Sequence, residues 1–594
     1  MKLSDYVFEY LKEKGVKNVF MLPGGGAMHL VDSLGNSGLE FIACQHEQAA
    51  SIMAEAYGQH TNTPGVCLTT SGPGATNAIT GVTAGWIDST PMFIISGQAK
   101  RSDLIGETGV RQIGSQEVQI IDMVKPITKY AIQIMDASEI RYVMGKAYHE
   151  ATTGRPGPVW ISIPLDVQAA EIEPEKLKGF ESDSTKKADI SKEVEKTFEV
   201  LINSHKPMFL AGNGIKLSGA TEEFYKLTDL LEIPVETTWK TIDMFGEEDS
   251  CYMGHPGGMG DRGANWVLQE ADVLISVGSR IDTSLTAFNE ANFGKNAKKV
   301  IVDIDANELN RMKLQQVEAK ISCDAKLFIE GLTKKIEQYK SDNNSDFEEK
   351  KIEWKKWLNY GKELRKAYPS VTQLHREKKD YVSAYYFTEL LCKYTSKDDV
   401  IVPESSGAAG GITYQAFSPK RGQKMKNAAG LGSMGFGLPY SIGSCLANDK
   451  RRTILINGDG AFQLNIQELE TLVRLNLPIK IFIWNNGGYA SIRGMQNNNF
   501  AGHQVASGKE SGLSMPNISK VAGAYGIKTT QIRNNSELEE KIPKILKTCN
   551  NELELIEIFI AEDDIVSPRT KSFRRSDGTM ESSKLEDMWP RVER

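Results

Sequence analysis

Short apolar runs alternate with amphipathic, helix-like stretches through most of the chain. Residues 66–70 form an apolar run that ends at the turn sequence Ser-Gly-Pro-Gly, and residues 77–88 follow with a helical pattern. Residues 91–96 predict the next strand, and a strand after the turn at 154–157 closes the block. Strands that alternate with crossover helices are typical of a parallel sheet. Residues 1–170 are therefore predicted to form one α/β unit.

Two further blocks repeat this alternation and predict α/β units over residues 190–340 and 375–562. A polar stretch over 171–192 links the first two units, and a Lys/Glu/Asn-rich run over 341–356, interpreted as a solvated helical face, separates the last two. Residues 563–594 form a polar tail that either closes as a lid or stays partly disordered. The predicted strands are 206–214, 271–278 and 299–305 in the central unit, and 399–403, 452–456 and 479–484 in the third.

Composition limits the class of protein. A chain of 594 residues is long enough for about three to five domains. With 40% hydrophobic and 25% charged residues, the chain is not predicted to be disordered as a whole. Its 70 Lys and Arg against 77 Asp and Glu give a net charge of −7, so it lacks the basic excess of a nucleic-acid-binding protein.

The cysteines and the N-terminus indicate the compartment. The seven cysteines form no Cys-x-x-Cys pair, which argues against a zinc site or a redox dithiol and fits a reducing compartment. Asp5 and Glu9 lie where a signal peptide would need an apolar run. No apolar stretch reaches the roughly 18 residues of a membrane span. The sequence predicts a cytoplasmic protein without membrane or nucleic-acid partners.

The strongest chemical signal is a Gly-Asp-Gly turn in the third unit. A predicted strand ends at Ile456 and runs into Asn457-Gly-Asp-Gly-Ala461 at the start of a helix predicted to reach about residue 475. Helix N-termini attract phosphate, whereas an Asp there repels it unless a divalent cation lies between them. The next strand ends at Asn485-Asn486. Both turns are expected at the carboxyl ends of adjacent parallel strands, where such sheets bind ligands.

Gly-Asp-Gly, then 24 residues, then Asn-Asn resembles the cofactor motif of thiamine diphosphate-dependent enzymes. The resemblance implies that Asp459 and Asn486 bind Mg²⁺ together with the backbone carbonyl of Gly488. It further implies cofactor contacts from Gly458, Gly460, Ala461 and Tyr489.

Glu47 in the first unit resembles the catalytic glutamate of that family. On its own it is a first-turn helix carboxylate, stabilised by the helix dipole. By resemblance, it exchanges a proton with the aminopyrimidine ring, so that the 4′-imino form deprotonates the thiazolium C2. Met434 lies in Gly432-Ser-Met-Gly435, which resembles the segment that keeps the cofactor bent; the alternative is a core methionine. The remaining implied cofactor residues are Gly25, Pro73, Asn77, Ser406, Gly407, Ala408 and Gly432.

The resemblance covers nearly the whole chain in the order pyrimidine-binding, central and diphosphate-binding domain, and is greatest to acetolactate synthase large subunits. It implies three doubly wound parallel-sheet domains of the α/β class. It implies a site shared between two chains, with Glu47 from one and Asp459 from the other, and hence a homodimer or homotetramer. It also implies thiamine diphosphate and Mg²⁺ as cofactors.

Several positions depart from the acetolactate synthase pattern. Gln116-Glu117 matches, but Ser115 replaces a Phe, Met495 replaces a Trp, and Ala408-Ala409 replace Gln-His. Smaller side chains favour an acceptor bulkier than pyruvate. Ser284 replaces the second Arg of the family's flavin-binding segment, which corresponds to residues 278–284 here, so whether the protein binds FAD stays undecided. Gln116 is expected to position substrate, and the tentative substrate residues are Gly26, His29, Ser115 and Met495.

We therefore expect decarboxylation of a 2-oxo acid, pyruvate first, and transfer of its two-carbon unit to an acceptor carbonyl. The acceptor is a second pyruvate or a larger aldehyde or keto-sugar. A simple decarboxylase remains an alternative, although the adjacent His pair of such enzymes is missing. A non-catalytic thiamine-binding scaffold and a nicotinamide dehydrogenase are the competing classes.

Overall fold

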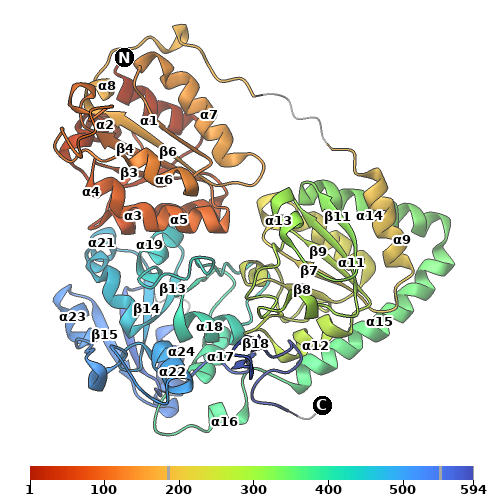
Figure 1. Cartoon of the computed structure of the whole chain (residues 1–594). Coiled ribbons are helices and arrows are strands. Elements are labelled where there is room, and N and C mark those ends of the chain that lie inside the picture. The colour runs from red at the N-terminus through yellow and green to blue at the C-terminus, as the bar shows by residue number, and fades with distance from the viewer. Residues whose placement is uncertain (183–187, 548–550, 563, 593–594) are drawn as a thin grey trace.

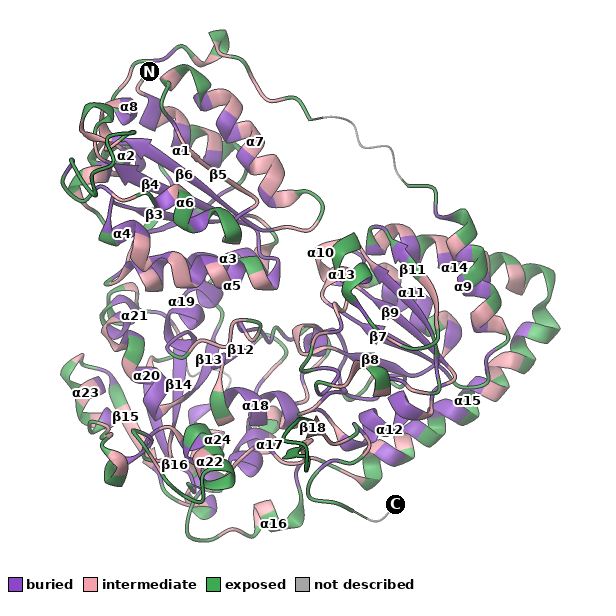
Figure 2. Ribbon diagram, in the orientation of Figure 1, coloured by how far each residue is buried: buried purple, intermediate pink, exposed green. Residues whose placement is uncertain are grey.

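The structure is a computed structural model that describes residues 1–182, 188–547, 551–562 and 564–592. Three parallel sheets, each flanked by helices, are arranged around a central junction (Figure 1). The inner strands of all three sheets are buried, while at least one edge strand of each sheet and the outer helix faces are partly exposed (Figure 2). The predicted α/β class is confirmed.

The first sheet has six strands in the order β2-β1-β3-β4-β6-β5. The helix expected over 77–88 is present as α5, which begins two residues later, and a short helix that was not predicted, α4, precedes it with Pro73 at its first position. The strands are β1 Asn18–Met21, β2 Glu40–Ala43, β3 Gly65–Thr69, β4 Met92–Gln98, β5 Tyr130–Gln133 and β6 Pro158–Pro164. The helices are α1 Leu3–Glu13, α2 Met28–Asn36, α3 Glu47–Thr61, α4 Pro73–Asn77, α5 Ile79–Asp88, α6 Ile120–Val124, α7 Ile140–Thr152 and α8 Leu165–Gln168.

The central sheet has the order β11-β10-β9-β7-β8. Helix α15 follows the predicted end of this unit at residue 340, and it packs into the central core through Trp354 and Trp357 while its charged side chains face outward. The strands are β7 Pro207–Ala211, β8 Val235–Thr237, β9 Val273–Val277, β10 Lys298–Asp303 and β11 Val317–Ser322. The helices are α9 Ser191–Ile202, α10 Gly214–Leu217, α11 Thr221–Leu231, α12 Arg262–Glu270, α13 Ala306–Arg311, α14 Ala325–Asp342 and α15 Asn344–Ala367.

The third sheet has the order β12-β13-β14-β16-β15, and β13 pairs in parallel with β14. The Gly-Asp-Gly and Asn-Asn turns therefore leave neighbouring strands at the same edge, as predicted. The strands are β12 Val400–Pro403, β13 Thr453–Gly458, β14 Ile479–Asn485, β15 Lys528–Ile532 and β16 Glu554–Phe559. The helices are α16 Gln373–Arg376, α17 Ala384–Tyr394, α18 Gly407–Ala416, α19 Gly437–Ala447, α20 Asp459–Phe462, α21 Leu469–Leu475, α22 Ala490–Asn499, α23 Ile518–Ala524 and α24 Asn535–Ile545.

The prediction of one continuous helix after the Gly-Asp-Gly turn is wrong. Helix α20 ends at Phe462, a 3₁₀ segment follows over Gln463–Glu468, and α21 begins at Leu469. Asn465 leaves the helical conformation because its side-chain amide donates to the Gly435 carbonyl at 2.8 Å and to Gln48 Oε1 at 3.1 Å. This interruption links the third unit to the start of α3 in the first unit.

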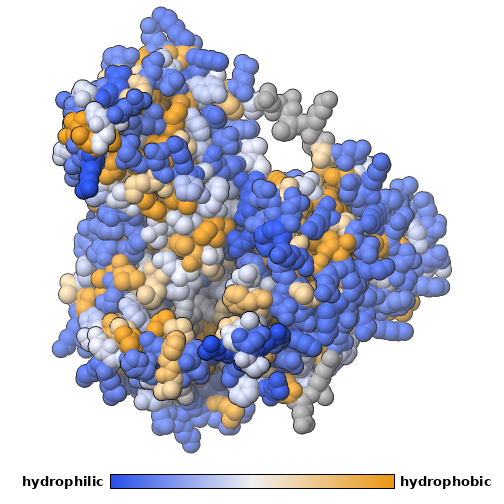
Figure 3. All heavy atoms as spheres, in the orientation of Figure 1, coloured by the Kyte–Doolittle hydropathy of each residue, from blue (hydrophilic) through white to orange (hydrophobic). Residues whose placement is uncertain are grey.

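The described part of the tail folds against the central unit. It forms the antiparallel pair β17 Ser572–Arg574 and β18 Met580–Ser582, and Glu586 then accepts hydrogen bonds from Gln269 and Asn292. Hydrophilic side chains dominate the face seen in Figure 3, with scattered apolar patches. Among the described residues, no helix combines the length and apolar character that crossing a membrane would require.

Candidate active site

The Gly-Asp-Gly turn buries one carboxylate at the edge of the third sheet. Asp459 is the first residue of α20 and is 1% exposed. Its Oδ1 accepts from the Gly460 amide at 2.9 Å, and its Oδ2 accepts from the Gly488 amide at 3.0 Å. Burial raises the pKa of the Asp459 carboxyl to about 6, although these amide hydrogen bonds oppose the shift. A cation beside Asp459 would therefore hold the carboxylate ionised.

Two further candidate oxygen ligands lie beside Asp459. One terminal atom of the Asn486 side-chain amide lies 2.9 Å from the Gly488 carbonyl oxygen and 3.3 Å from Asp459 Oδ1. As a nitrogen, this atom donates to both oxygens; as an oxygen, it completes a set of three oxygens. Mg²⁺ with ligands at roughly 2.0–2.1 Å places neighbouring octahedral ligands about 2.9 Å apart. The three residues fit the predicted metal, and their assignment as its ligands stays a prediction.

Glycines and a helix terminus surround this point. A Cβ on Gly460 would lie 2.5 Å from the Tyr489 ring, so only glycine leaves room for that ring. Gly458 and Ala461 flank Asp459 in the same turn. After the neighbouring strand β12, Ser406 precedes the first residue of α18, Gly407, whose φ is +71°. Free amides at the start of a ten-residue helix suit an anionic diphosphate. Ala408 lies in the first turn of α18.

The loop between α18 and α19 presents Met434 to the surface. Met434 is 38% exposed, which contradicts the alternative of an ordinary core methionine. Gly432, two residues earlier, has a φ of +67°, a backbone conformation that favours glycine.

Glu47 begins α3 and is 7% exposed. Asn77, at the end of α4, donates to Glu47 Oε2 at 3.0 Å. Gly74 packs so closely that a Cβ there would lie 3.4 Å from Glu47 Oε1. Two predicted site residues from separate helices thus meet, and within the described chain no other side chain donates a hydrogen bond to this carboxylate.

The first glycine turn lies beside the segment that carries Pro73. The Gly26 amide donates to Thr70 Oγ1 at 3.1 Å, and a Cβ on Gly26 would collide with Ser71. Gly25 and Pro73 are exposed. His29 lies on α2 and is half-buried.

Gln116 and Ser115 lie on an exposed loop of the first unit. Gln116 has a φ of +59°, and its carbonyl packs against Gly72. The loop is folded around Glu117, which is 3% exposed and accepts from the amides of Ile105, Ile113 and Gly114. Met495 lies on α22 and is 47% exposed. In the part of the chain that the structure describes, none of these tentative substrate residues forms a hydrogen bond with Asp459.

Sequence reasoning missed two buried charged residues beside the site. Glu404 directly follows β12 and accepts from the amides of Ser405 and Gly437, and burial raises the pKa of its carboxyl to about 7. Arg493, on α22, donates to the carbonyl of Asn486 at 2.7 Å. The sequence offered one signal for Glu404, which is a charged residue directly after a predicted strand. No sequence pattern indicated Arg493.

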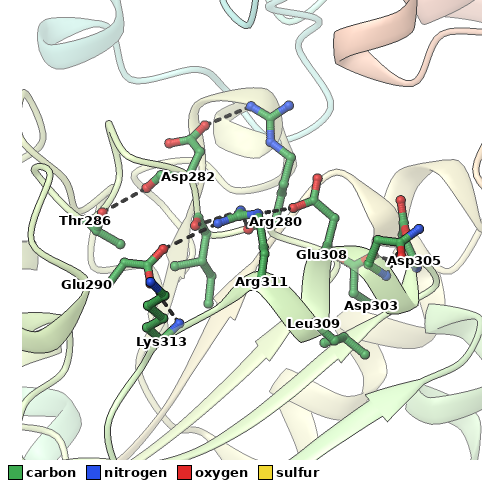
Figure 4. A network of polar contacts seen from close by, with 12 residues as sticks. Arg280, Asp282, Thr286, Glu290, Asp303, Asp305, Glu308, Leu309, Arg311 and Lys313 are labelled. Atoms are coloured by element: carbon green, nitrogen blue, oxygen red, sulfur yellow. Dashed lines mark hydrogen bonds and ion pairs between the residues drawn. The ribbon is translucent and has the colours of Figure 1, made fainter. Parts of the chain in front are cut away.

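A cavity of about 240 Å³ lies at the carboxyl edge of the central sheet. Arg280 lies in the wall of this cavity, and its guanidinium donates to Asp282 at 2.9 Å and to the Ile87 carbonyl at 3.1 Å. Figure 4 shows Arg280 with Asp282, and Arg311 with Glu308 and Glu290. Glycine turns, Ser284, Asp303 and residues 87–89 of the first unit belong to its lining, as do Ala429 and Gly430 of the third unit.

Three family models match the chain. The thiamine pyrophosphate enzyme N-terminal TPP binding domain matches residues 1–140, the central domain 194–332, and the C-terminal TPP binding domain 405–558. The chain is 32% identical to a probable acetolactate synthase large subunit of Methanococcus aeolicus, covering 92% of this chain and 90% of that one. It is 31% identical to the acetolactate synthase large subunit of Lactococcus lactis, covering 97% and 95%. It is 30% identical to the acetolactate synthase isozyme 2 large subunit of Escherichia coli, covering 92% and 94%.

Proposed function

Because the chain belongs to the thiamine pyrophosphate enzyme family and is an acetolactate synthase-like, thiamine diphosphate-dependent enzyme, we propose that it is a carboligase acting on pyruvate. It decarboxylates one pyruvate and transfers the two-carbon unit to a second, giving 2-acetolactate. The observation that carries the proposal is the convergence of Asp459, Asn486 and the Gly488 carbonyl at the edge of the third sheet.

The metal proposed for this point is Mg²⁺. Asp459 supplies one charged oxygen, and Asn486 and Gly488 supply two neutral ones, which is the kind of ligand set that Mg²⁺ shares with phosphate oxygens. The cation would also neutralise the repulsion between Asp459 and a diphosphate at the start of α18.

Thiamine diphosphate, when bound, supplies the nucleophilic carbon and the electron sink for decarboxylation. Glu47 would hold or release a proton at Oε1 beside the cofactor, since Oε2 accepts from Asn77. Met434 would support the bound cofactor, and Gln116 would orient the substrate. Burial of Glu47 and Asp459 limits access of water to both charged groups.

We place the complete site in a homodimer, with Glu47 from one protomer and Asp459 from the other. Apolar residues around the third-unit half of the site support this proposal, because Met434, Leu464 and Ile492 are all at least 38% exposed in the single chain. Such residues fit the core of an interface better than open surface.

The central cavity is the proposed position for FAD, if the enzyme carries one. Glycine turns allow close backbone approach, Arg280 offers a cation and Asp303 a carboxylate near the strand ends. Ser284 leaves one wall without the arginine found in the family segment. A flavin absorbance band in protein purified without added FAD supports occupancy, and its absence after FAD addition and desalting rejects it.

Incubation with Mg²⁺, thiamine diphosphate and ¹³C-pyruvate, followed by NMR of the products, tests the proposed function. Labelled 2-acetolactate is expected. Slow CO₂ release without acetolactate would reject pyruvate as acceptor and point to a larger aldehyde or keto-sugar, as the smaller side chains at Ser115 and Met495 allow. No turnover would reject pyruvate as donor.

A further inference from the structure

Arg493 is a buried cation whose ion-pair partner is exposed to solvent. It lies one turn into α22 and is 7% exposed. Within the described residues, its ion-pair partner is Glu562, whose carboxylate is 3.9 Å from Nη2 and belongs to a side chain that is 75% exposed. A buried guanidinium is costly unless its donors are satisfied, so its partners show what it holds in place.

Those partners are backbone carbonyls from two segments. Nη2 donates to the Asn486 carbonyl at 2.7 Å, and Nη1 donates to the Gly487 carbonyl at 3.3 Å. Nη1 also donates to the Ser507 carbonyl at 3.0 Å. One side chain thus fixes the backbone on which Asn486 and Gly488 present their oxygens, and fixes residue 507 beside it.

Residues 500–513, which we term the flap, return toward the site at this point. The Tyr489 amide donates to the Ser507 carbonyl at 2.9 Å, and Gly488 forms an antiparallel bridge with Gly508. The Ser511 hydroxyl accepts from the amides of Ser507 and Gly508, which closes the turn. The outer part of the flap carries exposed apolar residues, Phe500 and Val505.

We propose that Arg493 is a positioning residue that couples metal binding to the order of the flap. When Asn486 and Gly488 take a metal, their backbone becomes rigid, and Arg493 transmits that constraint to Ser507. The inference rests on the proposed Mg²⁺ site. It assigns Arg493 no contact with substrate or with the metal.

Gln496 supplies a matched control from the same helix. Its side chain donates to the Val505 carbonyl at 3.0 Å and accepts from the Val505 amide at 3.3 Å, so both of these hydrogen bonds reach the flap and not residues 486–488. Gln496→Ala therefore loosens the flap without touching the metal-binding turn. Arg493→Met removes all three carbonyl contacts, and Arg493→Lys keeps the charge but loses the planar fork.

Two measurements on the full chain with thiamine diphosphate test the coupling. The first is Mn²⁺ binding followed by electron paramagnetic resonance, with Mn²⁺ as the probe for Mg²⁺. Arg493→Met is expected to weaken Mn²⁺ binding by about 10–100-fold, the usual effect of losing a residue that supports a metal ligand. Arg493→Lys is expected to be intermediate, and Gln496→Ala to bind like the wild type.

The second measurement is hydrogen–deuterium exchange in peptides that cover residues 505–511. Metal and cofactor should slow exchange there in the wild type and in Gln496→Ala, and much less in Arg493→Met, in which the Tyr489–Ser507 hydrogen bond and the Gly488–Gly508 bridge still join the turn to the flap. Wild-type Mn²⁺ affinity together with normal flap protection in Arg493→Met would overturn the coupling. If Arg493→Met fails to fold, wild-type behaviour of Arg493→Lys in both measurements overturns it. If the wild type itself binds no Mn²⁺, the proposed metal site fails instead.

Discussion

At the residue scale, two buried carboxylates lie in different surroundings. Glu47 accepts one side-chain hydrogen bond, from Asn77, whereas Asp459 accepts two backbone amides. Backbone donors cannot rotate away, so they hold Asp459 fixed toward Asn486 and Gly488. A carboxylate with a single side-chain partner is better suited to exchange a proton, because one oxygen is left for another molecule. The surroundings of Asp459 therefore match a metal ligand, and those of Glu47 match a proton-exchanging acid.

The pKa of Asp459 predicts how metal binding depends on pH. Burial raises that pKa from 3.8 to about 6, so in the metal-free protein a proton competes with the cation below that pH. Metal affinity should be constant well above pH 6 and fall about tenfold per unit below it, since one proton must leave. Mn²⁺ titrations across this range check the slope. An affinity that does not change across this range would contradict Asp459 as the ligand.

The raised pKa of Asp459 also predicts how the stability of the folded protein depends on pH. The folded metal-free protein binds the Asp459 proton more tightly than the unfolded chain does. The contribution of this group to stability is therefore greatest below pH 3.8 and is lost as pH rises through about 6. Added Mg²⁺ should offset that loss, so the rise in melting temperature with Mg²⁺ should be larger above pH 6 than below it.

At the element scale, the pairing of α3 with α19 positions the first unit on the third. Twelve of the fifteen residues of α3 are buried, because the helix lies between the first sheet and α19. Gly443 of α19 faces the Met53 carbonyl and Ala56 so closely that a Cβ would collide with the carbonyl. The start of α3 then meets the 3₁₀ segment, where Glu468 accepts from the Gln45 amide at 2.9 Å.

Gly443→Ala should therefore destabilise the protein by about 1–3 kcal/mol, the cost of overpacking a close contact. Gly35→Ala is the control, since a Cβ added to Gly35 in α2 would meet no described atom within 4 Å, and it should stabilise by about 0.4–1 kcal/mol. Urea unfolding measures both changes. Equal effects of the two substitutions would contradict the close packing of α3 on α19.

At the scale of the whole molecule, Lys240 joins the three units. Its ammonium group forms an ion pair with Asp88 at 2.8 Å and donates to Gln59 Oε1 at 2.9 Å, both in the first unit. It also donates to the Asn427 carbonyl of the third unit at 2.6 Å. The Asp88 and Lys240 side chains are only 4% and 17% exposed. One side chain of the central unit thus fixes the relative placement of the other two.

Lys240→Met should lower the free energy of unfolding by about 3–5 kcal/mol, because it leaves Asp88 buried without its cation. Lys544→Met is the control, since Lys544 is 71% exposed and pairs with Glu540 on one helix face; its effect should stay within about 0.5 kcal/mol. Denaturant midpoints compare the two variants. A small loss in Lys240→Met would contradict the role of Lys240 in joining the three units.

The sequence predicted the features that local pattern controls. Strands β3, β4, β13 and β14, the turns that follow them and the start of α3 at Glu47 all depend on short-range periodicity and turn chemistry. The interruption at Asn465 and the roles of Arg493 and Lys240 depend on partners far away along the chain, so no local pattern indicates them. The packing of α15 on the central core was hidden by its charged outer face, since only Trp354, Trp357 and a few other side chains point inward.

The central claim is that Glu47 activates thiamine diphosphate bound by Asp459 and Asn486. The most direct test is the rate at which the C2 proton of the bound cofactor exchanges with deuterium, compared between the wild type and Glu47→Gln. We predict that Glu47→Gln slows exchange by about 10²–10⁴-fold while the cofactor and Mg²⁺ remain bound. Exchange at the wild-type rate in fully loaded Glu47→Gln would contradict the account.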